Sequence, residues 1–172
     1  MVLQPADPFQ DAAASDLVRH DAVDRNGMIV GTHTTTNEHS LSRSYGNSKG
    51  LAPLLKKVKK AHRKKGVFAD KGYKVPDNDK LLKDGKMKNR IVHKAYRNRP
   101  LTQAQKRFNR LISKSRWVVE RTFGSIRRWF SAETFRYRGM AKMHSQHIME
   151  SIAHNLKRTP GILMSNCLKQ TE

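Results

Sequence analysis

The sequence predicts an α/β domain. Short β-branched or apolar runs alternate with segments in which apolar residues recur every three or four positions. An Asn-Gly pair follows the first such run, and 172 residues are enough to bury one core. Because strands that alternate with helices are typical of a sheet flanked by helices, we expect a small mixed sheet with basic helices around it.

Four segments read as strands. Residues 17–23 lead through the Asn-Gly pair at 26–27 into a returning strand over 28–36, which together predict a hairpin. The apolar triplet at 67–69 lies between turn signals, as a buried strand does. Residues 90–93 are a further short strand candidate.

Four helices are expected. Apolar residues at helical spacing predict them over 51–64, 102–130 and 141–158, and a Pro followed by acids starts a short helix over 76–84. The long segment begins with Thr102 as N-cap and a Gln three residues later, which is the capping-box pattern.

Details of these helices also follow from the sequence. Gly124 suggests a kink or a close approach within the long segment. The Thr-Pro-Gly run at 159–161 predicts the end of the last helix, whose His144 and His147 are expected on its surface. Its inner face is expected to carry Ile148, Ile152, Ala153 and Leu156.

The chain is strongly basic. Its formal net charge is +21 and its pI is about 10.6, which predicts a polyanionic partner, foremost nucleic acid. No run of eighteen apolar residues is present, so we expect no membrane span, and no secretory signal is visible. Cys167 is the single cysteine, which excludes an internal disulfide framework and favours a reducing, intracellular setting.

The chain divides into three parts by composition. Residues 1–17 contain two Pro, an Ala run and three Asp, and are expected to form a poorly ordered leader. Residues 18–160 carry the periodic segments of the domain, and residues 161–172 follow as a tail.

Glu120 is the only acidic residue between Gly85 and Ala132, a stretch with fourteen Lys and Arg side chains. A basic surface binds nucleic acid without such a carboxylate, so its presence suggests metal-dependent chemistry on a phosphate backbone. The alternative is an exposed Glu that forms an i,i+4 pair with Arg116.

Asp70 directly follows the predicted strand at 67–69. Open α/β sheets bind ligands at the carboxyl ends of their strands, although an Asp near a Gly also commonly forms a turn. Together, Asp70 on a strand end and Glu120 on a facing helix could converge. Two carboxylates can bind Mg²⁺ or Mn²⁺, because these ions prefer oxygen ligands.

These residues carry a resemblance to a known family. Residues 69–73 (Ala-Asp-Lys-Gly-Tyr) resemble the second-Asp motif of DDE transposases of bacterial insertion sequences, in the IS-five group. Residues 119–124 (Val-Glu-Arg-Thr-Phe-Gly) resemble their Glu motif, and segments at 23–27, 34–39, 135–142 and 153–158 resemble further parts of the domain. The resemblance runs from about Val18 to Arg158.

The family's Glu motif has the pattern Y-(2)-R-(3)-E-(6)-K. Arg116 and Glu120 match it, Arg127 stands in for the Lys, and Ser113 replaces the Tyr.

The resemblance implies a ribonuclease-H-like fold and metal-dependent DNA cleavage and strand transfer. It implies that Asp70 and Glu120 are catalytic metal ligands for Mg²⁺ or Mn²⁺, and that the partner is the double-stranded DNA of transposon ends and target. It further implies a bacterial, cytoplasmic, nucleoid-associated protein that forms a homodimer when intact. The expected DNA-binding residues are Lys114, Arg116, Arg121, Arg127, Arg128 and Arg138.

The sequence departs from the family pattern upstream of the hairpin. The family's first catalytic Asp lies on a strand before the hairpin, and residues 1–17 do not resemble that strand. Neither Asp16, Asp21 nor Asp24 suits the position, and Ser40 stands where an Asp usually follows Asn37. We therefore expect that the first strand is missing and that the chain is a truncated, inactive copy.

Two other functions stay open. A non-catalytic basic nucleic-acid-binding protein would account for the charge but not for Glu120 within its motif. A metal-dependent nuclease on the same scaffold would account for both, so the sequence leaves open whether the chain is an enzyme.

Overall fold

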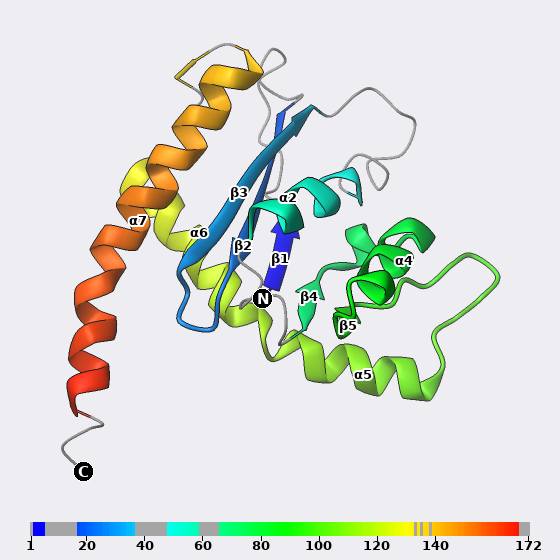
Figure 1. Cartoon of the computed structure of the whole chain (residues 1–172). Coiled ribbons are helices and arrows are strands. Elements are labelled where there is room, and N and C mark those ends of the chain that lie inside the picture. Colours follow the sequence, from blue (N-terminus) through cyan, green and yellow to red (C-terminus); the bar gives the residue numbers. More distant parts are fainter. Residues whose placement is uncertain are drawn as a thin grey trace.

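A five-stranded mixed sheet lies at the centre of the computed structural model, in the order β3-β2-β1-β4-β5 (Figure 1). The structure describes residues 2–5, 17–36, 48–58, 66–132, 134, 136–137 and 139–168. Strand β1 is antiparallel to β2 and parallel to β4, β2 and β3 form an antiparallel hairpin, and β4 and β5 are parallel. This arrangement confirms the predicted α/β class. The strands are β1 (Val2–Pro5), β2 (Leu17–Val23), β3 (Ile29–Thr36), β4 (Val67–Ala69) and β5 (Asn89–Ile91).

Strand β1 was not expected. It occupies the middle of the sheet, with Val2 opposite Val23 of β2 and opposite Phe68 of β4. The prediction that a first strand is missing is therefore wrong, as is the expectation of an unstructured leader for residues 2–5. A four-residue run that ends in Pro gives too short a pattern to be distinguished from a leader. Its sequence, Val-Leu-Gln-Pro, contains no acidic residue.

The described residues form six helical segments beside the sheet. The capping box at Thr102 is present as predicted, since Thr102 Oγ1 accepts from the Gln105 backbone and the Gln105 side chain accepts from the Thr102 backbone. The predicted helix over 51–64 is seen as a helix to Lys57, and residues 59–65 lie outside the described part of the chain. The segments are α2 (Leu51–Lys57), η1 (Lys71–Tyr73), α4 (Pro76–Asp84), α5 (Gln103–Ser113), α6 (Arg116–Phe130) and α7 (Met140–Leu168).

The predicted helix over 102–130 is in fact two helices. It breaks at Lys114 and Ser115, not at Gly124, which lies within α6. A Cβ on Gly124 would have no neighbour within 4 Å among the described residues, so the expected close approach there is wrong. Nothing in the local composition at Lys114 and Ser115 signals the break.

Helix α7 continues beyond its predicted end. It runs through Pro160 to Leu168, so the expectation that 159–161 terminates it, with a separate tail after it, is wrong for this range. The fixed φ of Pro is compatible with a helix, although the ring removes the hydrogen bond that residue 160 would donate to Leu156. No described helix is long and apolar enough to cross a membrane.

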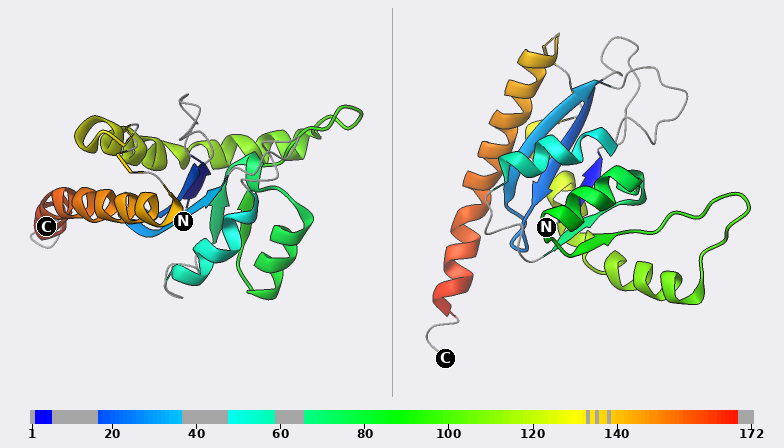
Figure 2. Two further views of the ribbon diagram at one scale, coloured as in Figure 1. Left: turned by 90° about the horizontal axis from the view of Figure 1, so that it is seen from above. Right: turned by 45° about the vertical axis from the view of Figure 1, so that its right-hand side comes forward.

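The sheet buries side chains on both faces. Ala22 belongs to a core cluster with α2 residues such as Leu54, whereas its neighbour Val23 packs with Val119 and Ile126 of α6. Alternate residues of a strand point to opposite faces, so α2 and α6 cover opposite sides of the sheet (Figures 1 and 2). Tyr73 lies in the α2 cluster, fully buried, as the sequence predicted.

Helix α7 packs against the hairpin through polar side chains, which reverses its predicted inner face. Ile152 and Leu156 are 48% and 69% exposed, and Ile148 is also exposed. Ala153 is half-buried, and apart from Met143 the buried positions of α7 are polar: His147, Glu150, Ser151 and His154. The facing strand surface explains the reversal, because it presents Arg19, Asp21, Thr32 and Thr34, which need hydrogen-bonding partners when buried.

Candidate active site

Asp70 lies where β4 ends. Its backbone carbonyl accepts a hydrogen bond from the Tyr73 amide at 3.0 Å, which closes the turn of η1. Its side chain forms no capping hydrogen bond. The turn therefore uses the Asp70 backbone and leaves the carboxylate, which is 20% exposed, to face α6.

Glu120 projects from the first half of α6, with its side chain 58% exposed. The apolar residues of this helix pack on the hairpin side, and Thr122 fixes the register by donating to the Gly27 carbonyl at 3.2 Å. Because Val118, Val119 and Thr122 are buried, Glu120 is held on the outer face of α6.

Arg116 joins the two predicted metal ligands. Its Nη1 lies 3.6 Å from Asp70 Oδ1 and its Nε lies 3.7 Å from Glu120 Oε1. The i,i+4 pair between Arg116 and Glu120, which was the alternative interpretation of Glu120 from the sequence, is therefore present. It coexists with the long-range pair, so that Asp70 and Glu120 meet at one guanidinium.

These two ion pairs are weak. Both distances exceed hydrogen-bond length, and the three side chains are between 20% and 58% exposed. Exposed pairs of this kind contribute about 0 to 1 kcal/mol. The positions of Asp70 and Glu120 are thus set by β4 and α6, and Arg116 acts as a loosely held counter-ion between them.

The donor chemistry at this site suits a divalent cation. Both side chains offer carboxylate oxygens, and Mg²⁺ is often bound through one or two carboxylates together with substrate phosphates. Among the described residues, no group of three or more His, Cys, Asp or Glu side chains is arranged to hold a metal ion. Asp70 and Glu120 therefore fit such an ion only as part of a ligand set.

Most of the predicted DNA-binding residues lie along the exposed side of α6. Arg121 stacks over Trp117, with 4.6 Å from its guanidinium carbon to the ring centroid, and Arg128 lies 5.2 Å from the centroid of Trp129. Arg127 is exposed on the same helix, and Lys114 is exposed just before it. Arg138 lies outside the described residues.

The sequence reasoning overlooked both tryptophans. Trp117 and Trp129 are 55% and 54% exposed, and Lys157 of α7 lies 3.2 Å from the centroid of Trp129. An arginine within four positions of each tryptophan was the available signal. Cations over exposed aromatic rings are a common feature of nucleic-acid-binding surfaces.

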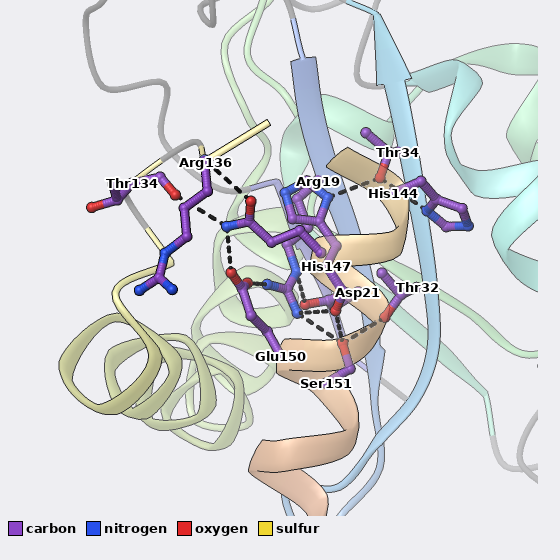
Figure 3. Close-up of polar contacts among 11 residues, drawn as sticks. Arg19, Asp21, Thr32, Thr34, Thr134, Arg136, His144, His147, Glu150 and Ser151 are labelled. Atoms are coloured by element: carbon purple, nitrogen blue, oxygen red, sulfur yellow. Dashed lines mark hydrogen bonds and ion pairs between the residues drawn. The ribbon is translucent and has the colours of Figure 1, made fainter. Parts of the chain in front are cut away.

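A buried polar network beside α7 was also missed (Figure 3). Arg19 on β2 donates to Asp21 at 2.7 Å, to Glu150 at 2.6 Å and to Ser151 at 2.8 Å. One cation thus pairs with two carboxylates. Burial raises the pKa of Asp21, although Arg19 opposes this effect.

Two buried histidines extend the polar contacts. His147 bonds with Thr34 at 2.9 Å, so its predicted surface position is wrong, and burial lowers its pKa to about 3. On the opposite face of β2, His20 bonds with the Tyr73 hydroxyl at 2.7 Å, and burial lowers its pKa to about 4. Both rings are therefore neutral at pH 7. His144 is half-buried and bonds with Thr34 at 3.1 Å.

The chain is similar to known transposases over most of its length. The family model described as "Transposase DDE domain" matches residues 19–156. A transposase for insertion sequence element IS1106 of Neisseria meningitidis serogroup B is 36% identical over 146 residues, which cover 84% of this chain and 47% of the relative. The chain thus spans about half the length of that relative, and no solved structure matches it significantly. The chain belongs to the transposase DDE domain family.

Proposed function

We propose that this chain is the metal-binding part of an insertion-sequence transposase, whose reaction is DNA cleavage and strand transfer at the ends of the element. The meeting of Asp70 and Glu120 at Arg116, from elements fifty positions apart, carries the proposal. A divalent ion bound by these carboxylates would activate a hydroxyl nucleophile and stabilise the leaving oxygen. The sheet order, with a parallel β1–β4 pair beside an antiparallel hairpin, supports a ribonuclease-H-like fold.

In this proposal the cations of α6 bind the DNA backbone. Arg121, Arg127 and Arg128 lie on the helix that carries Glu120, and Lys114 precedes it. Arg116 would leave the carboxylates and bind a phosphate when the metal ion and DNA arrive, because its ion pairs are weak. Arg138 stays a predicted phosphate-binding residue, because only the sequence supports this role. A DNA-bound protein of this charge would lie with the nucleoid in the bacterial cytoplasm.

We also propose that the chain by itself does not cleave DNA. Strand β1 lies next to β4 but contains no acidic residue. Asp21 on β2 is fully buried and pairs with Arg19 through Oδ2, and it forms no three-carboxylate group with Asp70 and Glu120 among the described residues. Incubation of the purified chain with transposon-end DNA and Mg²⁺ should give no cleavage, and specific nicking at the element's end would overturn this part.

Metal binding tests the site itself. In an Mn²⁺ titration followed by electron paramagnetic resonance, Asp70→Ala and Glu120→Ala should each weaken binding about tenfold. Asp77→Ala, which removes an exposed acid of α4, should leave the affinity unchanged. If all three variants bind Mn²⁺ like the parent chain, the alternative of a non-catalytic basic nucleic-acid-binding protein is favoured.

The exposed apolar stripe of α7 supports a homodimer. We define this stripe as Ile152, Leu156, Leu163 and Met164, which are between 48% and 69% exposed. Its first three members are spaced four and seven positions apart, as on one face of a helix. Residues 159–168 contain no charged side chain, so two copies can approach here despite the net charge of +21. We propose that two copies associate through this stripe.

A further inference from the structure

A cavity of about 760 Å³ lies at the end of α6, apart from the acidic pair. Its walls come from the last residues of α6, the segment that follows it, and the first half of α7. Trp129 is nine residues after Glu120, which corresponds to about 14 Å along the helix axis. The cavity is therefore a separate place on the same helix.

Three aromatic rings line the cavity. Trp129, Phe130 and Tyr137 line it together with Met149, and the first and third of these are 54% and 55% exposed. Aromatic rings at an open cavity offer flat apolar surfaces on which another planar ring can stack.

Two of the three charged side chains that line the cavity are cationic. Arg136 and Lys142 line it, and Lys157 lies against the Trp129 ring. The carboxylate among the lining residues is Glu150, which is buried. Its two oxygens accept from Gln146 at 2.8 Å and from Arg19 at 2.6 Å, so this acid is already neutralised within the protein.

This combination selects a ligand that has a flat ring and a negative charge. We propose that the cavity binds an unpaired nucleobase of a DNA strand, with its ring against Trp129 and Tyr137 and its phosphates beside Arg136 and Lys142. A paired base inside a duplex is stacked on its neighbours and cannot enter such a cavity without leaving the stack. The proposal rests on the proposed function in that it takes DNA as the ligand, but it does not depend on cleavage.

The test separates the base from the phosphates. Fluorescence anisotropy measures the binding of the full chain to a short oligothymidylate and to an abasic strand of the same length and charge. The parent chain should bind the strand with bases about tenfold more tightly, since every base has a flat face that can stack on an aromatic ring. Trp129→Ala and Tyr137→Ala should each reduce this ratio towards one.

Tyr96→Ala is the matched control. Tyr96 is 58% exposed and has Lys94 5.9 Å from its ring centroid, but it does not line the cavity. The variant should keep the full ratio, and circular dichroism melting should show that all three variants fold. Equal binding of both strands by the parent chain, or equal losses in the Trp129 and Tyr96 variants, would refute the cavity as a base site.

Two further binding measurements identify the ligand. Thymidine monophosphate should compete only weakly, because it lacks the backbone that meets the other cations, and strong competition would assign the cavity to a free nucleotide instead. Duplex DNA should bind the parent and the Trp129→Ala variant with similar affinity. If the parent chain bound no DNA at all, the proposed function as a whole would be refuted. If it bound strands with and without bases equally, only the base site in the cavity would be refuted.

Discussion

Arg19 Nη1 lies 2.6 Å from Glu150 Oε2, so that a buried ion pair joins β2 to α7 across 131 positions of the chain. Both side chains are less than 10% exposed. Burying this ion pair removes water from both charged groups, which costs free energy. Once buried, each charge is stabilised mainly by its partner.

We expect Glu150→Gln to destabilise the fold by about 3 kcal/mol, because it keeps the shape of the side chain but leaves Arg19 with only one carboxylate. Urea unfolding followed by circular dichroism measures the change. Asp79→Asn is the control, since the Lys74–Asp79 pair is partly exposed and its loss should cost about 1 kcal/mol or less. Equal losses of unfolding free energy in the two variants would show that the buried ion pair stabilises the fold no more than the exposed one.

The buried histidines predict a loss of stability in mild acid. The folded-state pKa of His147 is lowered to about 3, below the unfolded value of about 6.5. The unfolded chain therefore binds the proton first, and this contribution to stability is lost as pH falls from about 6.5 towards 3. Between pH 7.5 and pH 5 the loss from His147 alone should be about 2 kcal/mol.

Other groups modify this trend. His20, with its pKa lowered to about 4, adds in the same direction, whereas the raised pKa of Asp21 favours the folded state as pH falls. His147→Asn isolates one contribution, because Asn retains a polar atom near Thr34 but does not titrate. Urea midpoints at pH 7.5 and pH 5 should differ less in this variant than in the parent, and an unchanged difference would contradict the assignment.

Arg116 should weaken metal binding at the acidic pair. A positive charge near 4 Å from a carboxylate opposes a second cation by about 1 kcal/mol even in water, so Arg116→Gln should raise Mn²⁺ affinity about fivefold. Arg121→Gln is the control variant. It removes the same charge at the position next to Glu120, from a guanidinium that stacks on Trp117. The control variant should bind Mn²⁺ like the parent, and a loss of affinity in Arg116→Gln would show that Arg116 organises the carboxylates instead.

The cations of α6 should set the salt dependence of DNA binding. Arg121→Ala with Arg128→Ala should lower duplex affinity uniformly across sequences and reduce the slope of log K against log salt by about 2, since each phosphate contact contributes about 0.9. Lys83→Ala with Lys80→Ala, on exposed positions of α4, should leave the slope unchanged. Equal changes in both pairs would indicate binding by overall charge alone.

The candidate site was accessible from the sequence because local signals define each of its parts. Asp70 follows an apolar triplet between turn signals, which is typical of a short buried strand, and Glu120 lies four positions after Arg116 on an amphipathic helix. The capping box at Thr102 was equally local. The meeting of the two carboxylates depends on tertiary packing. The family resemblance predicted that meeting, whereas the periodicity of the apolar residues did not.

The parts that sequence reasoning missed depend on partners far along the chain. Strand β1 exists because β2 and β4 flank it, and its four residues have no strand pattern of their own. The inner face of α7 was reversed because apolar periodicity alone does not reveal that the opposing strands present Arg19 and Asp21. A polar sheet surface selects the polar face of a helix, and this leaves the apolar face outside.

That exposed apolar face gives the last prediction. Leu156→Glu should leave the unfolding free energy of the monomer within about 0.5 kcal/mol, because Leu156 is 69% exposed and surface changes of this kind are small. It should nevertheless abolish self-association, because two copies would bury two unpaired carboxylates at the centre of the α7 stripe. Leu111→Glu, which changes a 65% exposed leucine of α5, should leave association unchanged. Sedimentation equilibrium measures both variants, and a parent chain that stays monomeric would show that the stripe is not a contact between copies.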